Sequence, residues 1–269
     1  MPKIEKVKYH KLIYLFVCIA LFDQSISMKN INTYNESSLH FTLKKLYSLN
    51  EGDRTEVVLD GHIYDIVTKD QDVIEIQTKN IYSLKEKILD SLSKDRSVKI
   101  VHPIPCIKII QTKDKEGNII SCRKSPKRLS IYSVFNEIKS FFPILLMENF
   151  CLELIICEIT EERVRTEEKE QSKNKRRRFK KNWQIVNKKL DKIIETKTLK
   201  TRQDYLSLLP ENLPAEFCVN DIKNAFKIDK TKNADCIKNA NIMIWTFFKM
   251  GIIEFIGKKG NSKIYRLSK

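Results

Sequence analysis

The sequence predicts a mixed α/β domain, with helices around a mixed sheet, followed by a small separate domain of helices and one hairpin. Over residues 35–103 the apolar period follows the order helix, three strands, helix, strand. Over residues 204–269, two helical stretches precede a hairpin signal instead. The stretch between the two, residues 161–203, is dominated by charged side chains, so we expect a basic linker there.

Composition restricts the class of protein. The 269 residues suffice for two ordinary domains, and 42% of them are hydrophobic, which excludes wholesale disorder. Lys and Arg number 50 against 34 Asp and Glu, a formal net charge of +16. Such an excess favours a polyanionic partner, most often nucleic acid, although a merely solvated lysine-rich surface gives the same count.

Cysteine and histidine usage argues against a metal-stapled or disulfide-bonded protein. The seven cysteines are odd in number and contain no CxxC pair, which predicts free thiols in a reducing, cytoplasmic compartment. The four histidines form no ligand spacing, so we interpret them as packing or surface residues.

The first 27 residues have the outline of a secretory signal, and a mis-assigned start of the chain is the other interpretation. Lysines precede the uncharged run Leu12–Phe22, which is too short for an ordinary membrane span. Because the thiols suit the cytoplasm, we favour Met28 as the working initiator. Export or peripheral membrane attachment remains the alternative.

The expected core, residues 28–160, begins with a helix after Asn35, whose apolar stripe starts at Leu39. Asp60-Gly61 is a strong hairpin signal between two strands. The next helix carries an apolar stripe, and His102-Pro103 closes the strand after it. The expected strands and helices are Thr55–Leu59, His62–Val67, Val73–Gln77, Tyr82–Leu92, Ser97–Val101, a hairpin of Cys106–Gln111 with Asn118–Cys122, Val134–Leu146 and Cys151–Ile159.

Two basic segments are candidate nucleic-acid contacts. The end of the charged stretch is the densest cluster, with Arg176, Arg177, Arg178, Lys180 and Lys181. It is either a solvated linker or an arm that contacts phosphates. In residues 204–269, helices Asn220–Phe226 and Ala234–Met250, a left-handed cap at Gly251 and a hairpin with Lys258 and Lys259 at its tip describe a winged helix-turn-helix. Such a fold binds DNA or another protein.

Polar residues on the second and third strands are candidate ligands for a divalent metal. Asp65 and Glu75 carry carboxylates on neighbouring strands, and Mg²⁺ held by such oxygens activates water against a phosphodiester. Gln77, and Lys79 if the strand persists, follow Glu75 on the same strand face. Lys85 or Lys87 of the next helix are alternative cations, and Glu36 and Glu56 extend the acidic cluster. The competing interpretation is an exposed, one-sided sheet.

The segment from Asn35 to Pro103 resembles the PD-(D/E)xK, or restriction-endonuclease-like, nuclease superfamily. That resemblance implies an αβββαβ core, with Glu36, Asp65 and Glu75 at the family's acidic positions. Gln77 departs from the usual Lys, which puts catalysis in doubt. From about Asn35 onward the chain is also similar to an uncharacterised bacterial family, on segments such as Tyr64-Asp-Ile-Val67 and Ile74-Glu-Ile-Gln-Thr78.

The first functional hypothesis is a nuclease dependent on Mg²⁺ or Mn²⁺ that the winged helix targets to double-stranded DNA. Its catalytic candidates are Glu36, Asp65, Glu75, Gln77 and Lys79, with Asp65 and Glu75 on the metal. We expect no small-molecule cofactor and no membrane partner, and a homodimer is compatible. The alternatives are a nuclease-like DNA-binding regulator that does not cut, and an exported or membrane-attached interaction protein.

Overall fold

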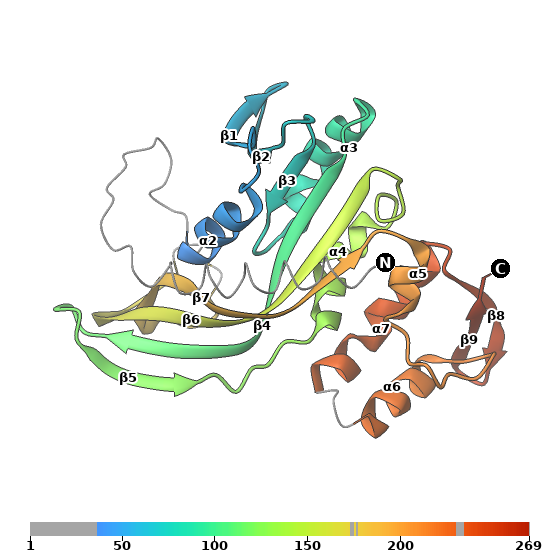
Figure 1. Cartoon of the computed structure of the whole chain (residues 1–269). Coiled ribbons are helices and arrows are strands. Elements are labelled where there is room, and N and C mark those ends of the chain that lie inside the picture. The colour runs from blue at the N-terminus through green and yellow to red at the C-terminus, as the bar shows by residue number, and fades with distance from the viewer. Residues whose placement is uncertain (1–36, 173–174, 176, 230–233, 269) are drawn as a thin grey trace. The chain divides into compact units, whose positions relative to one another are not determined.

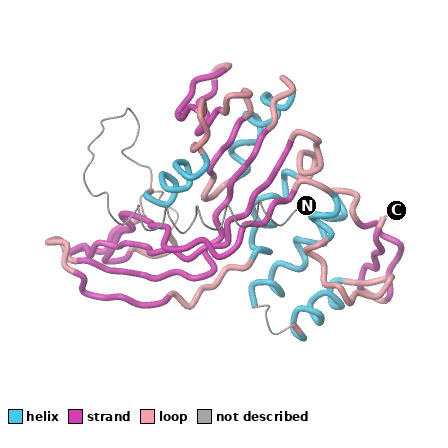
Figure 2. Tube along the Cα trace, in the orientation of Figure 1, coloured by secondary structure: helices cyan, strands magenta, loops and turns pink. Residues whose placement is uncertain are grey.

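The computed structural model describes residues 37–172, 175, 177–229 and 234–268 (Figure 1). Glu36, Arg176 and the signal-like residues 1–27 lie outside this set, so the predictions made for them receive no structural description. The described chain is a mixed α+β fold with one large mixed sheet, a separate hairpin and several helices, as Figure 2 shows. The coarse fold class predicted from the sequence is therefore confirmed.

The expected order of the first six elements is present. It runs α2 (Ser38–Tyr47), β1 (Arg54–Leu59), β2 (His62–Val67), β3 (Val73–Ile76), α3 (Lys85–Ser93) and β4 (Val98–Lys113). β1, β2 and β3 pair antiparallel, while β3 and β4 pair parallel, with α3 as the crossover between them. Asp60 and Gly61 both have positive φ, as a two-residue hairpin turn requires.

Alternation along the strands places apolar groups on both faces of the sheet. Leu39 and Leu43 of α2 pack with Ile74 and Ile76 of β3 in one buried cluster. The other face carries a larger cluster, which α3, β4 and the later helices share. The sheet is therefore covered on both sides, and polar groups on its buried positions need partners.

β4 continues through two prolines, which contradicts the predicted strand end at His102-Pro103. Pro103 and Pro105 lie after β3 has ended at Ile76 and before β5 (Ile119–Lys124) begins to pair at Ile109. The carbonyls of Ser97 and Val101 face β3. By alternation, the main chain of both prolines faces that same side, beyond the end of β3. A missing N–H breaks no ladder hydrogen bond there, because no strand of the described residues pairs with this side of β4.

The predicted linker, residues 161–203, is also wrong for most of its length. β6 (Phe150–Glu170) and β7 (Lys181–Leu199) form a long antiparallel hairpin at the edge of the main sheet, and β6 runs parallel to β4. Cross-strand pairs neutralise the charges that suggested solvation: Lys108 Nζ lies 3.0 Å from Glu161 Oε2, and Lys113 Nζ lies 2.8 Å from Glu162 Oε1.

The helix expected over residues 134–146 is broken into short turns: η3 (Ile131–Val134), α4 (Phe135–Ile138) and η4 (Lys139–Phe141), with Pro143 two residues beyond. Together with η2 (Ile81–Leu84) they cover the sheet face of the larger cluster.

The C-terminal part contains α5 (Arg202–Leu206), α6 (Val219–Ile228), α7 (Ala234–Lys249), β8 (Ile253–Lys259) and β9 (Ser262–Leu267). Gly251 has a φ of 71°, as predicted for the cap of α7. This part is not separate in its packing. The Phe135 and Phe247 ring centroids lie 5.4 Å apart, and Asp235 accepts hydrogen bonds from Ser130.

Two further expectations concern thiols and membranes. The six cysteines that the structure describes form no disulfide, as predicted. Among the helices of the described residues, none combines the length and apolar character needed to cross a bilayer. The run Leu12–Phe22 lies outside those residues.

Candidate functional site

Asp65 and Glu75 lie side by side where β2 and β3 diverge. The ladder between the two strands ends at Ile66 and Ile74. Beyond it, the Ile76 N–H donates to Asp65 Oδ2 at 2.8 Å, and the Asp65 N–H donates to Glu75 Oε1 at 3.2 Å. Each carboxylate accepts a main-chain N–H of the other strand, in place of a carbonyl of its own strand. The backbone itself therefore orients both side chains.

Lys87 of α3 is the cation beside this pair. Its Nζ lies 2.6 Å from Glu75 Oε1, and the two side chains are 15% and 6% exposed. The same Nζ lies 4.5 Å from the centroid of the Tyr64 ring and donates to the Ile63 carbonyl. Burial raises the pKa of Glu75 to about 7; the positive charge of Lys87 opposes this rise, and the negative charge of Asp65 adds to it.

Asp65 has basic neighbours on α2. His40 Nε2 lies 3.4 Å from Asp65 Oδ2, and Lys44 is ion-paired with Glu56. Burial alone would raise the pKa of Asp65. The hydrogen bonds from His40 and from the Ile76 N–H, together with the charge of Lys44, outweigh burial and hold that pKa below its ordinary value. Asp65 is therefore ionised at neutral pH.

Glu56 lies opposite Asp65 in the β1–β2 register, between the pairs Thr55–Ile66 and Val57–Tyr64. Its φ of 53° is unusual for a residue other than glycine and is a conformation that the surroundings must enforce. The Glu56 side chain is 51% exposed and is ion-paired with Lys44, so its membership of the acidic cluster stays a prediction.

The donor set fits one small divalent cation. Among the described residues, hydrogen bonds reach Oδ2 of Asp65 and Oε1 of Glu75, which leaves Oδ1 and Oε2 available to a ligand. Mg²⁺ often takes only one or two carboxylates and completes its shell with water or phosphate oxygens. No group of three or more His, Cys, Asp or Glu side chains suited to a metal occurs in the part of the chain that the structure describes.

Two predicted site residues point elsewhere. β3 ends at Ile76, so the expectation that Lys79 shares a strand face with Glu75 is wrong. The Gln77 amide donates to Asn80 O and to Ser83 Oγ, both at 3.2 Å, and holds the following loop. Lys87, an alternative in the sequence, takes the position beside Glu75. The contact between His40 and Asp65 was missed, because the two residues are far apart in the chain.

The basic cluster after β6 is partly structural. The Arg177 guanidinium lies 4.2 Å from the centroid of the Trp183 ring and donates to the Glu170 and Trp183 carbonyls. Arg163 lies 3.6 Å from the same centroid. Arg177 therefore closes the β6–β7 hairpin, while the other described members of the cluster are exposed, namely Arg178, Lys180 and Lys181.

The C-terminal hairpin presents exposed lysines, as predicted. Lys258 pairs with Lys263 across the hairpin, and Lys259 precedes the turn. Helix α7 has less surface free for contact with DNA, because side chains including Asn239, Met243 and Phe247 are buried.

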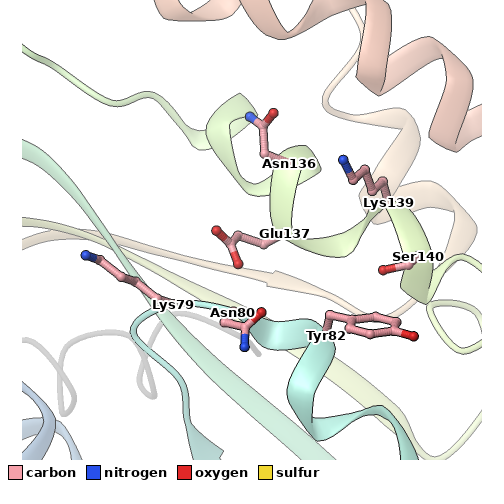
Figure 3. Close-up of a pocket in the computed structure, with 7 residues that line it drawn as sticks. All are labelled: Lys79, Asn80, Tyr82, Asn136, Glu137, Lys139 and Ser140. Atoms are coloured by element: carbon pink, nitrogen blue, oxygen red, sulfur yellow. The ribbon is translucent and has the colours of Figure 1, made fainter. Parts of the chain in front are cut away.

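A polar groove that sequence reasoning missed begins just after β3 (Figure 3). It encloses about 590 Å³. One wall is the segment from Lys79 to Tyr82, and the other is formed by α4 and η4. Its lining residues are Lys79, Asn80, Tyr82, Asn136, Glu137, Lys139 and Ser140.

Comparison with known proteins gives a family without an assigned activity. A family model described as "Domain of unknown function (DUF8091)" matches residues 37–200. An uncharacterized protein of Treponema pallidum (strain Nichols) is 30% identical over 192 residues, which are 71% of this chain and 73% of that protein. No solved structure matches the chain. The family match ends close to the predicted start of the C-terminal part at residue 204.

Proposed function

We propose that this chain, which belongs to the DUF8091 family of domains of unknown function, is a divalent-metal-dependent nuclease that hydrolyses phosphodiester bonds in DNA. The observation that carries the proposal is the interlocked pair of Asp65 and Glu75 with Lys87 Nζ 2.6 Å from Glu75. Two carboxylates and one ammonium, fixed by backbone and burial, form a compact acceptor for a cation and a phosphate.

The order and pairing of the elements support the finer fold that the proposal assumes. α2, the antiparallel β1–β2–β3, the α3 crossover and the parallel β4 agree with an αβββαβ restriction-endonuclease-like core. In the C-terminal part, α6 and α7 precede the β8–β9 hairpin, and Phe217 bridges to Tyr265. That order agrees with a winged helix, whose hairpin would contact the DNA backbone.

The residues of the site have separable roles in this proposal. Asp65 Oδ1 and Glu75 Oε2 would hold Mg²⁺ or Mn²⁺, which, when bound, neutralises phosphate charge and lowers the pKa of a water molecule. Lys87 keeps Glu75 oriented and adds positive charge where phosphate negative charge develops. His40 fixes Asp65 from the α2 side.

The test is nicking of supercoiled plasmid by the full chain with Mg²⁺ or Mn²⁺. Asp65→Asn and Glu75→Gln preserve side-chain size while removing the charge that holds the ion. We expect each to reduce nicking at least about a hundredfold, a typical loss for a group that stabilises the transition state.

Glu86→Gln is the matched control, since Glu86 is an exposed carboxylate of α3, one residue from Lys87. Its nicking should equal that of the parent. Cutting that persists in both Asp65→Asn and Glu75→Gln would place the chemistry elsewhere.

A second candidate function is a DNA-binding module that does not cut. Two features favour it. Gln77 stands where the PD-(D/E)xK nuclease superfamily usually has Lys, and Lys87 already pairs with Glu75 without an ion. Isothermal titration with Mn²⁺ separates the two functions: the nuclease binds the ion through Asp65, whereas the module releases no heat that depends on Asp65.

A further inference from the structure

The groove beside β3 has a lysine on each wall and a tyrosine at one end. Lys79 lies at one end and Tyr82 at the other, with Asn80 between them (Figure 3). The Tyr82 side chain is 56% exposed although it belongs to a helical turn next to the core. Lys139 reaches the groove from the opposite wall. The groove thus offers positive charge and an exposed aromatic ring within one cavity.

One acidic residue lines the groove, and it is engaged in a main-chain contact. Glu137 Oε2 accepts the N–H of Ile81 at 3.3 Å, at the start of η2. The uncommitted polar character of the groove therefore comes from Lys79, Lys139 and neutral groups such as Ser140.

Lys79 also joins the groove to a lysine cluster on the sheet. Lys188 of β7 lies opposite Glu161 of β6, and the positive charges of Lys79 and Lys108 act on the Lys188 ammonium group. Glu161, the carboxylate nearby, already binds Lys108 at 3.0 Å and Arg163 at 2.8 Å. Cations therefore exceed carboxylates in this cluster.

Neighbouring lysine ammonium groups repel each other and share no hydrogen bond, because an ammonium group only donates. Burial, followed by the charge of Lys79, lowers the pKa of Lys188 to about 8. An anion between Lys79 and Lys188 would accept from both and remove the repulsion. Phosphate oxygens are strong acceptors for such a pair.

We propose that the groove and the lysine cluster form one site for a single nucleic-acid strand, in which Lys79 and Lys188 bind a phosphate and Tyr82 stacks on a neighbouring base. The inference rests on the proposed function for the choice of nucleic acid as the anion. A single strand is indicated because an unpaired base exposes the ring face that Tyr82 can cover, whereas duplex bases are already stacked. Lys139 would then contact the next phosphate.

The test is anisotropy of a fluorescent oligo(dT) strand with the full chain in EDTA, so that binding is measured without hydrolysis. We expect Tyr82→Ala to weaken binding about tenfold, the effect of losing one stacked base, and Tyr82→Phe to bind like the parent. Lys79→Gln with Lys188→Gln should reduce the slope of log affinity against log salt by about 0.7 per lysine.

The control pair is Lys69→Gln with Lys227→Gln, which removes the same charge from exposed positions in a turn and on α6. Circular dichroism verifies folding, and Lys139→Gln replaces the double variant if that variant unfolds. Equal binding by Tyr82→Ala and Tyr82→Phe would overturn the proposal, as would equal salt slopes for the two double variants. Complete competition by inorganic phosphate at a similar concentration to oligo(dT) would reduce the site to a bare anion site and also overturn it.

The outcomes separate this inference from the nuclease proposal. Strand binding that needs Tyr82 and Lys79, in a chain that never nicks plasmid, refutes the nuclease and leaves the strand site standing. Nicking that needs Asp65, with strand binding indifferent to Tyr82, refutes the strand site alone.

Discussion

Two regions of the molecule differ in how buried charge is compensated. One is the carboxylate pair Asp65 and Glu75 on β2 and β3, and the other is the lysine cluster of Lys79, Lys108 and Lys188. Glu75 has a matched cation, Lys87, at 2.6 Å, whereas Lys188 has like charges as its close neighbours. Burial nevertheless moves both groups toward neutrality: the pKa of Glu75 is raised to about 7, and that of Lys188 is lowered to about 8. Sharing a sheet does not determine whether a charge is compensated.

The difference indicates which ligand each region lacks. Oxygens of Asp65 and Glu75 that accept nothing from the described residues suit a cation, while neighbouring ammonium groups suit an anion. Both regions adjoin β3 and its loop, so one phosphodiester chain could meet both. The expected effects of breaking each region follow, from largest to smallest.

Removing the cation of the carboxylate region should have the largest effect. Lys87→Met leaves Glu75 buried beside the negative charge of Asp65, and we expect a loss of about 3 kcal/mol in unfolding free energy at pH 8. The loss should be smaller at pH 5, where Glu75 is protonated in the parent. Urea unfolding at both pH values measures this; Lys85→Met on the same helix is the control, and an equal loss at both pH values would contradict the assignment.

Replacing Glu75 itself tests its raised pKa. In the parent, the stability linked to Glu75 is complete below its ordinary pKa of 4.5 and is lost as the pH rises through about 7. Glu75→Gln removes this dependence, so the difference in unfolding free energy between parent and variant should change by about 3 kcal/mol across that window. Parallel stability curves for the two proteins would show that Glu75 titrates normally.

Neutralising the lysine cluster should stabilise the protein. The stability linked to Lys188 is complete above its ordinary pKa of 10.5 and is lost as the pH falls through about 8. Lys188→Met should therefore gain on the order of 1 kcal/mol at pH 7, a value reduced for solvent screening, and gain nothing near pH 10.5. Thermal unfolding at the two pH values measures the gain, and a destabilised variant at pH 7 would refute the like-charge repulsion.

The smallest expected effect lies outside both regions, in the C-terminal hairpin. Lys258→Gln with Lys259→Gln should reduce the slope of log duplex affinity against log salt by about 0.9 for each phosphate that a lysine no longer neutralises. Plasmid nicking should remain dependent on Asp65. Titration of a labelled duplex at several salt concentrations measures the slope. An unchanged slope would assign duplex binding to another surface.

The sequence predicts the local parts of this arrangement well. Period-two alternation places Asp65 and Glu75 on neighbouring strands, and Asp60-Gly61 sets the hairpin that leads to them. Lys87 and His40 could not be chosen among their neighbours, because their positions depend on how α3 and α2 pack onto the sheet. The effect of the Lys79 charge on Lys188 depends on β7, which the sequence did not predict.

Strands β6 and β7 escaped prediction for a physical reason. Charged residues at Glu161 and Glu162 follow each other without alternation, since a register shift after Glu162 interrupts the period of two. Their partners lie on β4 and β7, so the pattern becomes regular only when the neighbouring strands are present. The hydrophobic pattern of such a strand, taken without its neighbours, therefore predicts a solvated linker.

The prolines of β4 have a consequence for how this protein coexists with other chains. Among the strands that the structure describes, none pairs with β4 between Val101 and Ile109 on the β3 side, and an unpaired main-chain edge can be a template for aggregation. Pro103 is buried and Pro105 is half-buried, so packing already limits access to that edge, and both prolines also remove hydrogen-bond donors from it. Pro103, which predicted a strand end in the sequence, thus helps to protect the sheet from intermolecular strand addition.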